Sequence, residues 1–354
     1  MTAFLAGVGT VAQQEFRLRI RAGRWRWLLV AWFATLALFT LLVRLSLGAS
    51  GADDPYGTPM YGSLMLLVLG MGMLVVPALT AQSVNGDRER GTLATLQVTR
   101  LRPGQIAVGK LAAAWGTSLV FLALTLPLVA WTMAEGGVPF GRLVVTMLVM
   151  ALLLGVTCAV AQGLSALLAR STTSAVLSYL TVFALTIGTL IVFGLATALT
   201  TETVTRTVRQ PASDPFSPPG APPTGTEEFT YTATQSRTDR VWWLVAPNPF
   251  VVLADAAPAL PERRDPVTGR RLPNASDPLG EIGRGVRTLR EPPEPESEAA
   301  VLDRPVSVQP EPRGAAVWPF GLAVNILLGA GALVITTRRL RTPVHAMPKG
   351  LRVA

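Results

Sequence analysis

Long apolar runs separated by short polar stretches dominate the pattern of this 354-residue chain. A helix needs about 20 apolar residues to cross the hydrocarbon layer of a bilayer. Six runs meet or approach that length and contain no Asp or Glu; they cover residues 27–43, 60–82, 111–134, 143–169, 172–199 and 316–337. The pattern therefore predicts an all-α integral membrane protein with six transmembrane helices, of which the first five form a membrane region over 27–199.

The first 26 residues have a different pattern. Apolar residues recur on one flank of a helix, while Arg17, Arg21 and Arg24 recur on the other, and Trp25 follows at the point where the first apolar run begins. Such a segment is typical of a helix that lies in the membrane interface. A cleaved signal peptide is the alternative, but the late start of the basic cluster and the long apolar run favour a retained segment.

Charge predicts the orientation of the spans. The stretches 1–26, 83–110 and 338–354, together with Arg170, carry a net charge of +13, and the rest of the chain carries −4. Because basic residues concentrate in cytoplasmic loops, both termini and the loop 83–110 are expected in the cytoplasm. The high content of Ala, Arg, Gly and Pro suggests a GC-rich bacterial genome, so the expected location is the bacterial plasma membrane. The high basicity then reflects topology and attraction to membrane lipid, and no nucleic-acid partner is expected.

The segment 200–315 is predicted to be a long, largely disordered external loop between helices 5 and 6. It holds 19 of the 28 prolines, and its polar tracts cannot bury enough apolar surface to fold. One short helix is expected near 248–257, because Asn248 can cap it and Pro249 suits its first position.

Catalytic chemistry finds little support. His345 is the only histidine, Cys158 is the only cysteine, and the apolar runs lack carboxylates. The tract GQIAVGKL at 104–111 approaches a nucleotide-binding loop, but Leu111 stands where Mg²⁺ needs a Ser or Thr hydroxyl. The chain is thus expected to be no enzyme, to lack ATPase motifs and to bind no cofactor itself.

The charged stretch 84–111, VNGDRERGTLATLQVTRLRPGQIAVGKL, interrupts two apolar runs. It resembles the first cytoplasmic loop of ABC-2 type transporter permeases, which docks onto a separate ATP-hydrolysing subunit. The tract 165–179 is similar to the tight turn between spans four and five of that family, and Asn248-Pro249-Phe250 to an element before its last span. Arg100 departs from the proline of many relatives.

The resemblance implies a permease subunit of an ATP-driven transporter, an exporter, in which ATP and Mg²⁺ bind to cytoplasmic ABC ATPase partners. A second permease copy or a paralogue would complete the substrate path. A helix is expected to begin at Glu89, with Gly91 allowing close approach and Lys110 lying at the phosphate level. The expected ATPase-coupling residues are Arg88, Glu89, Arg90, Gly91, Thr92, Leu93, Leu96, Gly109, Lys110 and Arg170.

Two other functions remain open on the sequence. A receptor or assembly factor would use the same spans to display the 200–315 loop to an external partner. A membrane-embedded hydrolase is disfavoured by the missing histidines and carboxylates.

Overall fold

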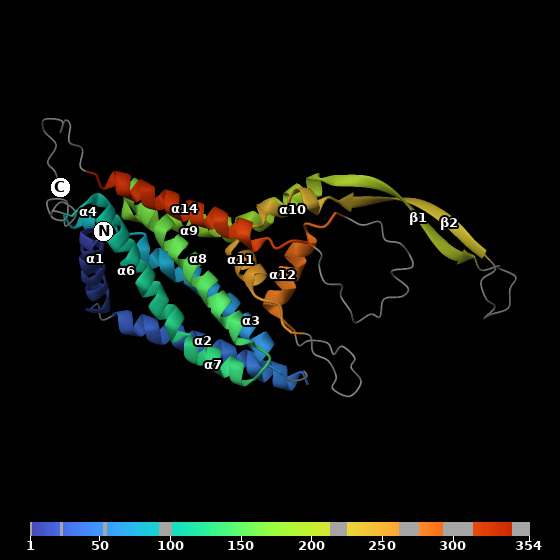
Figure 1. The fold of residues 1–354 in the computed structure, drawn as a ribbon, viewed down its shortest axis with the longest axis horizontal. Coiled ribbons are helices and arrows are strands. Elements are labelled where there is room, and N and C mark those ends of the chain that lie inside the picture. Colours follow the sequence, from blue (N-terminus) through green and yellow to red (C-terminus); the bar gives the residue numbers. More distant parts are fainter. Residues whose placement is uncertain are drawn as a thin grey trace.

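The computed structural model describes residues 2–21, 24–51, 55–91, 101–212, 225–261, 276–292 and 314–341, and this part of the chain is mostly helical. Six helical stretches in it are long and apolar enough to cross a membrane, as expected of a multi-pass membrane protein (Figure 1). They run over Trp25–Ala49, Gly57–Glu89, Pro103–Ala134, Phe140–Leu167, Ser171–Leu199 and Trp318–Arg339. Each apolar run of the sequence forms one of these stretches.

Helix α1 (Thr2–Arg21) precedes the six stretches and packs against the start of α6 (Pro103–Leu124). Helix α2 (Arg24–Ala49) continues beyond residue 43, where the apolar run was predicted to end. The arginine that ends the apolar run does not end the helix, because Arg has a high helix propensity. Arg44 is also paired: its Nε donates to Glu135 Oε1 at 2.9 Å, and its guanidinium lies 4.3 Å from the centre of the Tyr56 ring.

Helix α3 (Gly57–Thr80) lies at the centre of the bundle, packed against α6, α7 (Leu126–Ala134) and α8 (Phe140–Leu167). Its Leu64 and Leu69 are completely buried and belong to the same apolar cluster as Met150 and Leu153 of α8. The short helix α4 (Asn85–Glu89) follows α3 and completes the second stretch.

The fifth stretch consists of α9 (Ser171–Phe183), a π-helical turn η1 (Ala184–Gly188) and α10 (Thr189–Leu199). No residue of η1 or α10 is buried, so lipid or another chain must cover their apolar side chains. A π-turn changes the pairing of helix carbonyls. Here Asn248 Nδ2 donates to Thr186 O at 2.6 Å and to Thr189 Oγ1 at 3.0 Å, so this amide supports the π-turn from outside the helix.

The described parts of the region 200–315 include two strands that the sequence did not predict, so the described chain is not purely α. Strands β1 (Thr201–Ala212) and β2 (Gly225–Ser236) pair antiparallel and extend away from the bundle (Figure 1). Their register begins with Thr201 opposite Ser236 and ends with Ala212 opposite Gly225. Both strands are rich in Thr, Val, Phe and Tyr, which favour extended backbone. These two strands fall within the segment that was predicted to be largely disordered.

Two further helices of this region pack against the bundle. Helix α11 (Pro249–Ala256) begins with the capped proline that the sequence predicted, because Asn248 Oδ1 accepts from Phe250 N at 2.9 Å. Helix α12 (Pro278–Thr288) was not predicted and packs against α11 and α3. The last stretch is α14 (Trp318–Arg339). Asp255 connects these elements, since its carboxylate accepts from Arg287 Nε, Val317 N and Trp318 N at 2.6–2.7 Å.

Candidate functional site

The candidate coupling residues that the structure describes lie at one end of the bundle. Helices α1 and α4 and the start of α6 are grouped there, and the last turn of α14 reaches the same end (Figure 1). Val84, Ile106, Ala166 and Leu340 form a small apolar cluster beneath this surface. The structure therefore brings together residues from five separate segments of the chain. Thr92, Leu93 and Leu96 lie outside the described residues.

Helix α4 is tightly fixed to the turn between α8 and α9. Ser165 Oγ accepts hydrogen bonds from Val84 N and Asn85 N at 3.1 Å each, and Ser174 Oγ donates to Ala81 O at 2.8 Å. Arg88 Nη1 donates to Leu168 O at 3.2 Å. A force applied to α4 would be transmitted directly to the fourth and fifth stretches.

Glu89, Arg90 and Arg170 are exposed, whereas Arg88 is half-buried against the turn. Glu89 Oε1 accepts from Ser171 N at 3.3 Å, in the first turn of α9, where a helix favours negative charge. Arg170 is the residue directly before α9, and its backbone carbonyl accepts from Ser174 N at 3.1 Å. These three side chains form a charged surface of mixed sign.

The expected helix start at Glu89 is wrong, because α4 ends there. Arg90 closes the helix, and Gly91 follows in the left-handed conformation with φ of +70°. Within the described chain a Cβ on Gly91 would meet nothing within 4 Å, so no contact in this part of the chain requires a glycine here. Its role is to stop α4, because a left-handed backbone is strained for residues with a side chain.

Lys110 is buried within the described part of the chain. Its side chain is only 2% exposed, and Nζ donates to Asp87 Oδ2 and Glu15 Oε1. Asp87 also accepts from Arg90 Nη2 at 3.1 Å. The acidic partners attract the ammonium group inward, where their charges offset its loss of hydration. Lys110 thus joins α1, α4 and α6.

Gly109 allows α1 to approach α6. A Cβ at this position would lie 2.7 Å from Val11 Cβ and 3.0 Å from Val8 O. Gly7 of α1 fits equally closely against Gln105, whose Nε2 donates to Phe4 O at 3.3 Å. Sequence reasoning placed Gly109 in the candidate site but missed Glu15, the α1 residue that pairs with Lys110. The only signal for Glu15 was its position as the one acidic residue among the arginines of 1–26.

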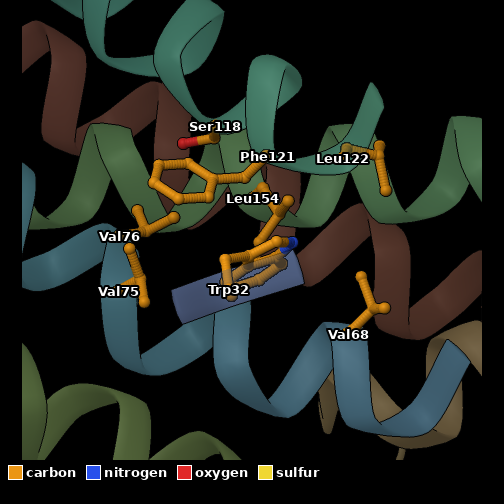
Figure 2. Close-up of a pocket in the computed structure, with 9 residues that line it drawn as sticks. Trp32, Val68, Val75, Val76, Ser118, Phe121, Leu122 and Leu154 are labelled. Carbon is orange, nitrogen blue, oxygen red and sulfur yellow. The ribbon is translucent and has the colours of Figure 1, made fainter. Parts of the chain in front are cut away.

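A crevice between α2, α3, α6 and α8 is lined by Trp32, Val68, Val75, Phe121 and other mostly apolar side chains (Figure 2). It leaves only about 10 Å³ for the centre of a water-sized sphere, which is at the lower limit for one water molecule. No substrate site is assigned there. Among the described residues no group of three His, Cys, Asp or Glu could hold a metal ion.

Comparison with known proteins identified no relative of this chain. No protein-family model matches this chain, and no curated protein shows significant similarity to it.

Proposed function

We propose that this chain is the permease subunit of an ATP-driven transporter of the ABC-2 type, working as an exporter. The observation that carries the proposal is the short helix α4, which displays Glu89 and Arg90 while its backbone is fixed to Ser165 and the α8–α9 turn. Such an element can receive a push from a soluble partner and pass it to several membrane spans. A loosely attached loop would move by itself and would not transmit the force to the spans.

The proposal includes the partners that the chain needs. Cytoplasmic ABC ATPase subunits would bind ATP and Mg²⁺ and dock on the surface formed by α4 and Arg170. A second permease copy or a paralogue would complete the substrate path. This requires the end that carries α1, α4 and the basic end of α14 to face the cytoplasm of a bacterial cell, in agreement with the excess of basic residues there.

The test is to co-express the chain with the ATPase encoded next to its gene and to measure co-purification and ATP hydrolysis in nanodiscs. Glu89→Arg should weaken co-purification and lower the hydrolysis rate of the complex at least fivefold. Glu281→Arg is the matched control, because Glu281 is an exposed carboxylate of α12, far from α4 (Figure 1). Equal behaviour of both variants would refute the docking role of α4.

A receptor or assembly factor is the second candidate, and one observation favours it. The β1–β2 hairpin extends well beyond the bundle and presents exposed Thr230, Tyr231 and Thr232 (Figure 1). Under this alternative no ATPase would co-purify with the chain. Deletion of the hairpin would abolish its activity, whereas Glu89→Arg would have no effect.

A further inference from the structure

A buried arginine lies at the opposite end of the bundle from α4. Arg142 is in the first turn of α8, and its side chain is 1% exposed. The N-terminal end of a helix carries partial positive charge, so a cation there is unfavourable unless an anion compensates it. The compensating anion is Asp277, 6% exposed, which stands directly before α12 and is distant in sequence.

Asp277 accepts hydrogen bonds from only one of the three guanidinium nitrogens of Arg142. Nη2 alone donates to both carboxylate oxygens, at 2.7 and 2.9 Å. Nε and Nη1 are buried and have no hydrogen-bond partner among the residues that the structure describes. A guanidinium has five N–H donors arranged to hold an oxyanion through two nitrogens. Asp277 is thus a suboptimal ligand, and each unpaired buried donor is costly.

The carboxylate of Asp277 could also form a different set of hydrogen bonds. As the residue before α12, it occupies the position from which an Asp normally accepts hydrogen bonds from the first turn of its own helix. It makes no such side-chain bond here, because the carboxylate is turned to Arg142. Release from Arg142 would let Asp277 cap α12. The two arrangements of one carboxylate provide a switch.

The two ends of α12 are held differently. Near its C-terminal end, Arg287 binds Asp255, a carboxylate that also caps α14. Near its N-terminal end, Pro278 lies close to α3, since a Cβ on Gly62 would be 2.9 Å from Pro278 Cδ, and the Arg142 pair is the polar attachment. Leu279, in the first turn of α12, is completely buried in the main apolar cluster, so loss of the Arg142 pair would remove the polar attachment of this end and leave its apolar one.

We propose that Arg142 is an oxyanion-binding residue that Asp277 occupies from within the chain, so that a phosphate or carboxylate group displaces Asp277 and loosens the start of α12. Leaving Arg142 without an anion would bury an uncompensated charge, so displacement needs a replacement anion. The hydroxyls of Tyr61 and Thr146, which bond each other, are near Arg142: Thr146 Oγ1 also donates to Arg142 O at 2.9 Å. The site recognises an oxyanion, whether on a lipid headgroup or on a soluble molecule.

The experiment uses the full chain in nanodiscs and follows hydrogen exchange of the α12 amides. In phosphatidylcholine nanodiscs, inorganic phosphate is titrated against chloride at equal ionic strength. A parallel sample replaces part of the lipid by phosphatidylglycerol. We expect about tenfold faster exchange over residues 279–283 with one of the probes, while α14 stays protected. A response to inorganic phosphate indicates a soluble ligand, and a response to phosphatidylglycerol alone indicates a lipid headgroup.

Two variants make the test decisive. Asp277→Asn keeps the shape but removes the competing charge, so the effective probe should raise the melting temperature of this variant by several degrees and more than that of the wild type. The double variant Arg142→Gln with Asp277→Asn removes both charges and should not respond. If Asp277→Asn does not fold, exchange in the wild type decides. No response to either probe, or an equal response in the double variant, overturns the proposal. No ATPase enters this experiment, so its outcome is independent of the proposed function.

Discussion

Replacing Lys110 by methionine tests whether the buried charge cluster holds α1 and α4 on the bundle. Methionine keeps most of the side-chain volume but leaves Asp87, which is 11% exposed, and Glu15, which is 23% exposed, without their shared cation. Removing one partner of a buried ion pair costs about 3–5 kcal/mol. The lower end applies here, because Glu15 is partly hydrated and Asp87 keeps Arg90. At an unfolding entropy of about 2.1 cal/mol/K per residue, a loss of about 3 kcal/mol lowers the melting temperature of a chain of this length by roughly 4 °C.

The assay is thermal unfolding of the purified protein in detergent, followed by hydrogen exchange of α1. Arg90→Met is the matched control, since Arg90 binds the same Asp87 but is 67% exposed, and exposed pairs contribute less than about 1 kcal/mol. Lys110→Met combined with Asp87→Asn should recover part of the loss, because an amide needs no cation. A melting temperature for Lys110→Met within about 2 °C of the wild type would refute the reasoning.

Three further variants or conditions have specific expected outcomes. Gly109→Ala should destabilise the protein by about 1–3 kcal/mol and speed hydrogen exchange of α1, because the added methyl group overlaps the facing helix. Gly91→Ala should cost about 1 kcal/mol from left-handed strain, measured as a lowered melting temperature without loss of membrane insertion. Hydrogen bonds from Arg237 hold the pKa of Glu202 and of Asp239 below their ordinary values of 4.5 and 3.8, so their stabilisation of the hairpin base is fully present above about pH 4.5 and is lost as the pH falls through the lowered values. Cleavage of the hairpin by an acid protease should increase over that range, and Arg237→Gln should remove the step.

The six membrane-length helices were predictable because apolar composition over about 20 residues is a local property of the sequence. The cap at Asn248 was predictable for the same reason, since capping involves residues two or three positions apart. The hairpin was also visible in principle: TVTRTVR at 203–209 alternates Thr with larger residues, the period-2 pattern of a strand. The many prolines of residues 200–315 dominate the average composition of that region and obscure this local pattern.

The contacts that define the candidate site could not be predicted in the same way. Lys110 finds Glu15 across 95 residues, and Arg142 finds Asp277 across 135 residues. No periodicity connects such partners, and the density of basic residues in 84–111 suggested a solvated surface throughout. Burial of Lys110 depends on α1 folding back over α6, which Gly7 and Gly109 permit only when both helices are already formed.

The two buried cations have a common physical origin. Apolar side chains gain little by leaving lipid for protein, so apolar contact alone does not fix a non-spanning segment to a membrane bundle. An ion pair does so, because a charge without its partner cannot stay buried at the end of a span. Lys110 fixes α1 and α4 in this way, and Arg142 fixes α12. The segments that we propose to meet an ATPase or an oxyanion are therefore those held by charge, and a competing charge is a direct means of moving them.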